Sequence, residues 1–449
     1  MKQRKTIIIV ALMLLLIGGV LVTIIPKYDR MAQIGVGYQT KIMCSEVFVA
    51  GRAPEDVAAT NFQNIDPLMD YVSLDVDPVA QTVTGSLLGL GKSKTIYRDK
   101  LGCTVDIGNG VFDIDIKDQG EINADNTHTY TVALKPEVQA AVAELFDDNE
   151  LAHPIVTRGV VVVQNGEIVA EHYSDGFDKD TRQQSWSMAK GVTQALVGIL
   201  VDRKVMSLDD KNLMANWPES DPRADISLGQ LLHMASGLEF AEEYGDAESD
   251  ATQMLFNSSD MGVYAAEKPL AVEPGSKSQY SSGTTNIVSL VMRNKLEASG
   301  ENYHDFPYDS LFTKIGMNSA IFEVDASGTF IGSSYIYATP RDFARFGQLY
   351  LQNGMWDDEQ ILPERWVDYT GQPAPGSDGK YGSHWSINRS GKNLPGMPNE
   401  VIYLGGNDGQ FIFVIPSKNA VIVRLGVMRE PATFENELYP LIRSVFDKL

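Results

Sequence analysis

One apolar segment near the middle of the chain, AKGVTQALVGILVD over residues 189–202, constrains the fold most strongly. Its apolar side chains recur at helical spacing, for example at Val192, Leu196 and Ile199, which predicts a helix buried in the centre of a domain. Lys190 lies at the start of this segment, although burying a lysine is costly unless its amine has a task. The sequence therefore predicts a central helix that carries a functional amine near its first turn.

A serine precedes this lysine by three residues, within the sequence SWSMAK. The spacing places Ser187 and Lys190 on one face of the helix, where their side chains can meet. Ser187 would lie in the first turn, where unpaired N–H groups favour developing negative charge. A neutral lysine amine can take the proton of a neighbouring serine hydroxyl, which makes the serine a nucleophile. The alternative is a surface serine and lysine, because Ser-x-x-Lys arises by chance about once in a chain of this length.

Two further motifs carry groups that suit the same chemistry. The first is PGSKSQYSSGTTN, in which Tyr280 is a candidate general base that later protonates the leaving group. The second is YLGGNDGQFIFVIP, whose glycines let the backbone approach a ligand closely. A backbone N–H at that strand edge, together with the N–H of Ser187, would form an oxyanion hole. The alternatives are an ordinary loop tyrosine and a plain glycine-rich hairpin turn.

Strand patterns lie at both ends of residues 136–449, with helical patterns between them. The run GVVVVQNGEIVAEHYS predicts a hairpin with Asn165-Gly166 as its two-residue turn, and QFIFVIPSKNAVIVRLGV predicts a second hairpin. The predicted helices are KPEVQAAVAELFDD, SLGQLLHMASGL ending at Gly237, TPRDFARFGQLYLQNG starting at Thr339-Pro340, and the closing PATFENELYPLIRSVFDKL. We expect an α+β domain in which one antiparallel sheet, built from both ends, is flanked by helices and interrupted by an inserted helical subdomain.

The order of these motifs resembles that of the serine β-lactamase-like hydrolases. A Ser-x-x-Lys pair is followed about 90 residues later by a tyrosine and then by a glycine-rich strand near the C-terminus. The resemblance covers residues 136–449 and includes SWSMAKGVTQALVGILVD, ISLGQLLHMASGLEF and ATPRDFARFGQLYLQNGMWDDEQILPERWV. This superfamily contains class C β-lactamases, D-Ala-D-Ala carboxypeptidases and esterases. The forms YSSG and GNDGQ are most similar to the 6-aminohexanoate-dimer hydrolase branch, so a β-lactamase/transpeptidase-like fold is expected.

The resemblance implies roles for particular residues. It makes Ser187 the nucleophile, Lys190 its partner and Tyr280 the tyrosine of the second motif. Ser282 stands where class C enzymes carry an asparagine. The positions expected to bind the oxyanion or the substrate are Ser187, Gly406, Asn407, Ser282 and Tyr244. Tyr244 matches a tyrosine on the substrate-covering loop of the nylon-oligomer enzymes, and its alternative is an ordinary loop aromatic.

Two departures from the family pattern narrow the expected substrate: Ser282 replaces the asparagine of the second motif, and the third motif lacks its lysine. The triplet Leu404-Gly405-Gly406 stands where the β-lactamases have Lys-Thr-Gly, so no fixed cation is available for a substrate carboxylate. Penicillins and peptides ending in D-Ala both carry such a carboxylate. We therefore expect a serine hydrolase that forms an acyl-enzyme on an ester or amide, with no cofactor and no metal. The alternatives are a class C-type β-lactamase or D-Ala-D-Ala carboxypeptidase, and an inactive sensor or binding module.

The first 30 residues have the character of a membrane anchor. MKQRK is followed by residues 6–25, which carry no charge and would span roughly 30 Å as a helix. Positive charges are denser before this segment than after it, which places the N-terminus in the cytoplasm and the catalytic domain outside, in the periplasm or extracellular space. The alternative is a cleaved signal peptide, although no small-residue cleavage site follows the segment.

Residues 31–135 show short strand-like runs such as TVTGSLLGL and VFDIDI, and we expect a small accessory domain there. Its two cysteines, Cys44 and Cys103, would form a disulfide in an oxidising compartment, and the alternative is two buried thiols. The formal net charge of −22 argues against a nucleic-acid partner, because phosphate binding needs a basic face. The expected partner is a small ester or amide substrate.

Overall fold

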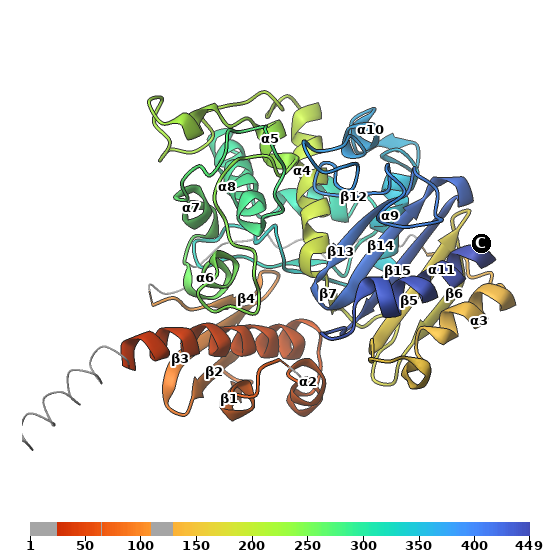
Figure 1. Cartoon of the computed structure of the whole chain (residues 1–449), viewed down its shortest axis with the longest axis horizontal. Helices are drawn as coiled ribbons and strands as arrows, with labels where there is room; N and C mark the ends of the chain where they lie inside the picture. The colour runs from red at the N-terminus through yellow and green to blue at the C-terminus, as the bar shows by residue number, and fades with distance from the viewer. Residues whose placement is uncertain (1–24, 64, 109–128) are drawn as a thin grey trace, which may run out of the picture.

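The computed structural model describes residues 25–63, 65–108 and 129–449 (Figure 1). Its centre is a six-stranded antiparallel sheet in the order β12-β13-β14-β15-β5-β6. The strands are β5 (Thr157–Gln164), β6 (Glu167–Tyr173), β12 (Ser386–Ile387), β13 (Ile402–Gly406), β14 (Gln410–Ile415) and β15 (Ala420–Gly426). Pairing of β5 with β15 joins the two ends of the hydrolase region, which confirms the predicted sheet.

Both faces of this sheet are covered, as the run of valines in β5 requires. Val160 and Val162 face one core and Val161 and Val163 face the other, and all four are fully buried. The first face packs against α3 (Pro136–Glu144) and α11 (Tyr439–Lys448), and the second against α4 (Ala189–Asp202) and α9 (Pro340–Leu351). The central position of α4 agrees with the burial predicted for its apolar residues.

Local signals in the sequence set several boundaries. Asn165 and Gly166 have φ values of 53° and 80°, as the two-residue turn of the first hairpin requires. The side chain of Thr339 accepts from the N–H of Asp342 and so caps α9. The prediction for α5 (Leu228–Leu232) is wrong at its end, because the chain turns at Met234 (φ 55°) well before Gly237. The backbone of residues 234–235 instead bonds to residues 275 and 279 of the second-motif loop.

The inserted helices form a layer beside α4 (Figure 1). They are α5, α6 (Asp250–Asn257), α7 (Met261–Ala266) and α8 (Ser282–Ala298). The smaller elements are α10 (Trp366–Thr370), the three-stranded sheet of β7 (Gln183–Gln184), β9 (Ile336–Ala338) and β8 (Ile321–Phe322), and the pair β10 (Met355–Trp356) and β11 (Glu359–Gln360). The side chain of Ser281 caps the start of α8, so the second motif is fixed to the end of that helix.

The N-terminal unit, defined as residues 25–63 and 65–108, combines a long helix with a four-stranded antiparallel sheet. The strands are β1 (Val72–Asp77), β2 (Thr82–Leu87), β3 (Leu90–Arg98) and β4 (Gly102–Val105), with α2 (Pro54–Asn61) at one end. The predicted run TVTGSLLGL forms β2, whereas VFDIDI lies outside the described residues. The helix over residues 25–44, which the sequence reading did not predict, lies between this sheet and α6, where Gly37 contacts Phe256.

Two buried links tie this unit together and to the rest of the protein. The disulfide between Cys44 and Cys103 joins the helix to β4 and confirms the predicted pairing. Lys41 forms an ion pair with Glu323 of the hydrolase region, and both side chains are at most 1% exposed. Burial lowers the pKa of Lys41, and the Glu323 carboxylate opposes that shift.

The predicted anchor, residues 6–25, lies outside the described residues except for its last member. Among the residues that the structure does describe, none of the helices combines the length and the apolar character needed to cross a bilayer.

Candidate active site

The entry to α4 places the predicted nucleophile beside the predicted amine. One 3₁₀ turn, Trp186–Met188, precedes α4, and Trp186 adopts a left-handed φ of 44°. Lys190 is 1% exposed, and its Nζ lies 3.0 Å from the Ser187 Oγ. Ser187 itself remains partly exposed, so a substrate can reach its hydroxyl.

The amine of Lys190 has two further partners. It lies 3.0 Å from the Oγ of Ser282, at the start of α8, and 3.0 Å from the carbonyl oxygen of Ser333. Three acceptors therefore surround the amine and fix its position at the base of the site. A neutral amine also carries a lone pair, so the contact with Ser187 can pass a proton from the hydroxyl to the nitrogen.

Tyr280 reaches the same place from the loop before α8. The Lys190 Nζ lies 4.7 Å from the centre of the Tyr280 ring, and the Tyr381 ring packs edge-on against it at 5.8 Å. No hydrogen bond of the Tyr280 hydroxyl is found among the described residues. The structure thus brings Ser187, Lys190 and Tyr280 together, while the proton-transfer role of Tyr280 stays a prediction.

Tyr244 belongs to the site as well, although the residue is 40% exposed. Its hydroxyl lies 3.2 Å from the Ser282 Oγ and donates to the Glu242 carboxylate at 2.6 Å. Desolvation of that hydroxyl, reinforced by the charge of Glu242, raises the pKa of Tyr244 well above its usual value. The hydroxyl therefore stays protonated and can donate a hydrogen bond.

Glu242 is a site residue that the sequence reading missed. Its carboxylate accepts from the backbone N–H of Ser282 at 2.8 Å and also from the Ser282 hydroxyl. A line of hydrogen bonds thus leads from Ser187 through Lys190 and Ser282 to a carboxylate. The stretch EFAEEYGDAESD holds five other acidic residues, and nothing local distinguishes Glu242 from them.

The glycine-rich motif lies at the entry to α4. A Cβ on Gly406, at the end of β13, would be 2.5 Å from the carbonyl oxygen of Ser185, so only glycine fits there. Asn407 follows directly and is exposed, and its role as oxyanion donor stays a prediction. Leu404 is 2% exposed and packs on Gly191, so this motif position supplies no cation to the site.

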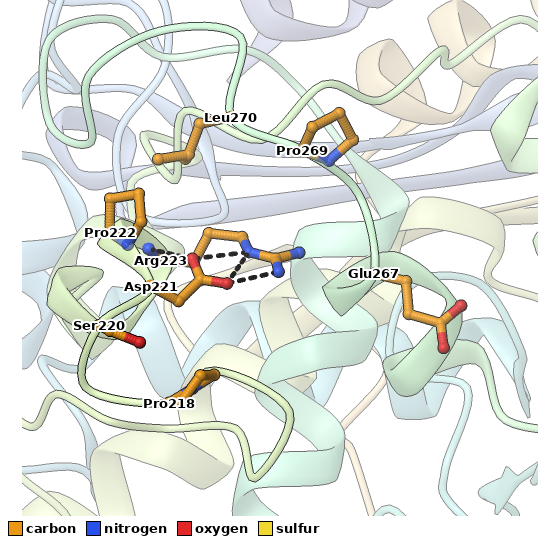
Figure 2. A pocket seen from close by; sticks show the side chains of 8 residues that line it. All are labelled: Pro218, Ser220, Asp221, Pro222, Arg223, Glu267, Pro269 and Leu270. Carbon is orange, nitrogen blue, oxygen red and sulfur yellow. Dashed lines mark hydrogen bonds and ion pairs between the residues drawn. The ribbon is translucent and has the colours of Figure 1, made fainter.

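A surface cleft of about 550 Å³ lies elsewhere and includes none of the predicted site residues (Figure 2). Arg223 is the cation in its lining. Asp221 binds this guanidinium, which also donates to the carbonyl oxygens of Ala266 and Lys268. Because its donors are engaged within the protein, we assign Arg223 a structural role.

His384 is a second buried group near Lys190 that the sequence reading did not single out. It is 2% exposed, with Nδ1 2.7 Å from the Leu232 carbonyl oxygen and Nε2 3.1 Å from the Thr285 hydroxyl. These partners suit a neutral ring that donates through Nδ1 and accepts at Nε2. Burial lowers the pKa of His384 to about 3, and the nearby Lys190 acts in the same direction.

This histidine should make the protein sensitive to acid. An unfolded histidine binds a proton below pH ~6.5, whereas His384 in the fold stays neutral down to about pH 3. The stabilising contribution is therefore complete above pH ~6.5 and is lost as the pH falls toward 3, by about 1.4 kcal/mol per pH unit. We expect His384→Asn to show a shallower fall in the free energy of unfolding between pH 6.5 and 4.5 than the wild type. Urea unfolding at several pH values measures this, and parallel profiles would contradict it.

A buried lysine beside a partly exposed serine, at the start of the central helix of an α+β domain, defines the protein as a serine hydrolase. A family model described as beta-lactamase matches residues 142–445, so the chain belongs to the beta-lactamase family. It is 23% identical over 323 residues to the 6-aminohexanoate-dimer hydrolase of Paenarthrobacter ureafaciens, covering 66% of this chain and 79% of that protein.

Solved structures agree on the fold. A Bacillus anthracis protein, provisionally named a 6-aminohexanoate-dimer hydrolase, superposes with a TM-score of 0.60 at 23% identity, over 72% of this chain and 87% of that one. A family VIII carboxylesterase superposes with a TM-score of 0.52 at 15% identity, over 72% of this chain and 99% of that one. The β-lactamase-like architecture expected from the motifs is therefore confirmed.

Proposed function

We propose that this enzyme hydrolyses an ester or amide through an acyl-enzyme on Ser187. The observation that carries the proposal is the 3.0 Å contact between the Ser187 hydroxyl and the buried Lys190 amine. The hydroxyl proton passes to the nitrogen while the oxygen bonds to the substrate carbonyl carbon, whose oxygen takes up the electron pair. Collapse of this intermediate expels an alcohol or amine, and water then releases the acyl group by the same sequence of steps.

Other groups have supporting roles in this proposal. The N–H groups of Ser187 and Asn407 bind the oxyanion. The close packing of Gly406 against the entry to α4 supports this role. Tyr280 shares the proton with Lys190 and delivers it to the leaving group. Ser282, held by Glu242, fixes the amine, and Tyr244, whose hydroxyl donates to Glu242, contacts the bound substrate. Covalent catalysis of this kind needs no metal or cofactor.

Leu404, in the third motif, favours substrates without a carboxylate over substrates that carry one. Leu404 supplies no cation, so a substrate carboxylate would find no fixed partner at this position. This favours a neutral ester or amide over a penicillin or a D-Ala peptide. The name of the Paenarthrobacter relative, an amide hydrolase, supports the amide side of the proposal.

We also propose that the catalytic domain lies outside the cytoplasm, tethered by residues 6–25. The uncharged sequence of that segment and the charges before it support the tether. The Cys44–Cys103 disulfide supports an oxidising compartment.

A substrate panel tests the proposed specificity. The purified full-length chain in detergent is given a p-nitrophenyl ester, a short amide oligomer and nitrocefin in parallel. We expect kcat/KM for the ester or the amide to exceed that for nitrocefin by about 100-fold or more, because the carboxylate of nitrocefin finds no charged partner at the third motif. Faster turnover of nitrocefin would favour a β-lactamase. No turnover of any of these substrates, together with no labelling of Ser187 by a fluorophosphonate probe, would favour the inactive sensor.

A further inference from the structure

The turn that follows β13 has a backbone that needs outside support. This oxyanion turn, Asn407–Gly409, contains two consecutive left-handed residues, Asp408 at φ 58° and Gly409 at φ 79°. A left-handed non-glycine residue costs on the order of 1 kcal/mol, so neighbouring groups must hold it. The Asp408 carbonyl oxygen accepts from the N–H of Met428 at 2.8 Å and from the Arg424 guanidinium at 3.3 Å, and these contacts hold the backbone of the turn but not the Asp408 side chain.

The Asp408 carboxylate links this turn to the nucleophile and to one arginine. Its side chain is 10% exposed. Burial raises the pKa of this carboxyl, and the Trp186 side chain, next to Ser187, opposes that shift by favouring the charged form. Its Oδ1 also accepts from the side-chain amide of Asn407 at 3.2 Å and from the Arg429 Nε at 3.4 Å. The residue proposed to donate to the oxyanion thus lies beside a carboxylate whose cationic partner is Arg429.

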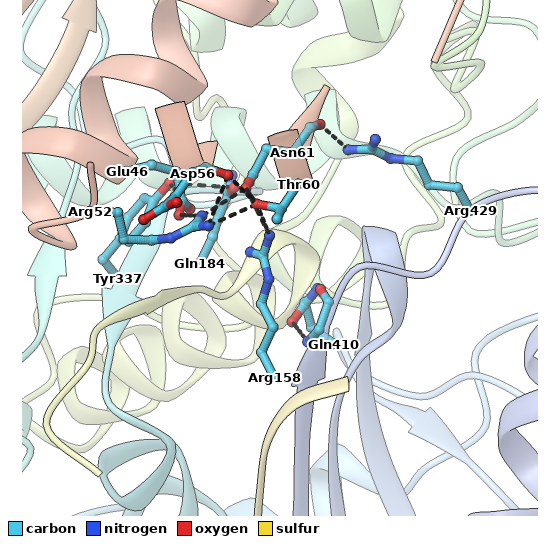
Figure 3. A network of polar contacts seen from close by, with 11 residues as sticks. Glu46, Arg52, Asp56, Thr60, Asn61, Arg158, Gln184, Tyr337, Gln410 and Arg429 are labelled. Atoms are coloured by element: carbon cyan, nitrogen blue, oxygen red, sulfur yellow. Dashed lines mark hydrogen bonds and ion pairs between the residues drawn. The ribbon is translucent and has the colours of Figure 1, made fainter. Parts of the chain in front are cut away.

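Arg429 is in turn held by the N-terminal unit (Figure 3). Its guanidinium donates to the backbone carbonyl oxygens of Asn61 and of Gln63, the latter at 2.5 Å, and lies 3.5 Å from the Tyr38 hydroxyl. These three acceptors come from the helix over residues 25–44, from the last residue of α2 and from the turn just after it. The Arg429 side chain is 15% exposed, so water competes weakly for it.

A second set of contacts fixes the end of α2 on which Arg429 depends. The Asn61 side chain accepts from Arg52 of the same unit and from Arg158 of β5, both at 2.7 Å. Arg52 also pairs with Glu46, so Asn61 is held from both sides. The position of the Asn61 carbonyl oxygen is therefore set jointly by the N-terminal unit and by Arg158 of β5.

We propose that Arg429 is a positioning residue through which the N-terminal unit holds the oxyanion turn for catalysis. This inference rests on the proposed function, because it assigns the turn to oxyanion binding. The family match begins at residue 142, so the acceptors that hold Arg429 lie outside the part shared with the family. The N-terminal unit thereby becomes part of the catalytic apparatus of this chain, acting at a distance from the reacting atoms.

The effect has two physical parts. Arg429 fixes the Asp408 side chain and so adds to the backbone contacts that keep the left-handed turn in one conformation, with the Asn407 N–H pointing to the same place in each turnover. It also neutralises Asp408, which would otherwise repel the negative charge that develops on the substrate oxygen. Both parts act on the transition state more than on the bound substrate, so kcat should change more than KM.

The test compares Arg429→Gln with the wild type on a p-nitrophenyl ester. We expect kcat to fall by about 10- to 100-fold, less than the loss of a whole oxyanion donor, with KM changed by less than about threefold. Arg429→Lys should recover part of kcat, because it restores the charge and one donor. In the double variant Asp408→Asn/Arg429→Gln the unpaired carboxylate is also gone, so kcat should exceed that of Arg429→Gln.

Arg443→Gln is the matched control, because Arg443 pairs with Asp447 within α11 and touches neither Asp408 nor Asn61. It should keep kcat within about twofold, and circular dichroism confirms that each variant is folded. Unchanged kcat in Arg429→Gln, or an equal loss in Arg443→Gln, would overturn the inference. If Arg429→Gln does not fold, Arg429→Lys and the double variant decide in the same way. A wild type without ester turnover would refute the proposed function instead, so the two failures are distinguishable.

Discussion

Ser187→Ala should lower kcat for a p-nitrophenyl ester by at least about 10³-fold, the loss expected when a nucleophile is removed. Without the hydroxyl no acyl-enzyme forms, and only the oxyanion donors and substrate binding remain to assist water. A fluorophosphonate probe should label the wild type once per chain on the tryptic peptide that contains Ser187, and should leave the variant unlabelled. Steady-state kinetics and peptide mass spectrometry measure the two effects.

Ser185→Ala is the matched control, because Ser185 flanks the same tryptophan but bonds only to the backbone. Its Oγ donates to the Trp186 carbonyl oxygen at 2.9 Å and accepts from the N–H of Ile336 at 3.1 Å. This variant should keep its labelling and most of its turnover. Turnover by Ser187→Ala equal to that of the wild type, or labelling that moves to another serine, would refute the nucleophile assignment.

The parts of the fold that could be predicted are those fixed by neighbouring residues. Asn165-Gly166 supplies two residues that tolerate positive φ, which sets the turn of the first hairpin, although a shift between Val162 and Val163 then changes the register. Thr339 and Pro340 likewise set the start of α9. The serine and lysine are three residues apart, so any helix through them brings their side chains together. These features could therefore be predicted from neighbouring residues alone.

The helix over residues 25–44 was missed because it is buried on more than one side. Tyr38 and Thr40 face different neighbours, α6 and the sheet of the N-terminal unit, so the usual polar face is absent. Gly35 and Gly37 also lower its helical propensity, and both face close neighbours: a Cβ on Gly35 would lie 2.6 Å from the Met69 sulfur, and one on Gly37 would lie 3.2 Å from the Phe256 Cβ. Tertiary packing therefore decides this helix.

Site residues that depend on long-range contacts could not be predicted from the sequence either. Glu242 meets Ser282 across 40 residues, and Arg429 meets Asn61 across 368. No spacing rule links such pairs, since the fold alone brings them together. Tyr244 was found only through its resemblance to a loop tyrosine of the nylon-oligomer enzymes, and its contact with Ser282 now gives it a physical place in the site.

Lys190→Met should lower kcat for the same ester by about 10²- to 10⁴-fold, the range expected for loss of a general base. Methionine keeps the length and most of the volume of the buried side chain, so the fold should persist. It removes the lone pair that accepts the Ser187 proton and the donors that face Ser282 and Ser333. Phosphonate labelling of Ser187 should slow in parallel, because the same proton transfer precedes it.

Lys190→Arg separates proton transfer from charge. A guanidinium keeps the positive charge but stays protonated under all ordinary conditions, so it cannot accept the serine proton. We expect this variant to be as slow as Lys190→Met, although it retains a cation at the base of the site. If Lys190→Arg instead turned over ester at the wild-type rate, charge alone would suffice and the base would have to be another group. Tyr280, whose ring lies 4.7 Å from the amine, would then be the group to replace next.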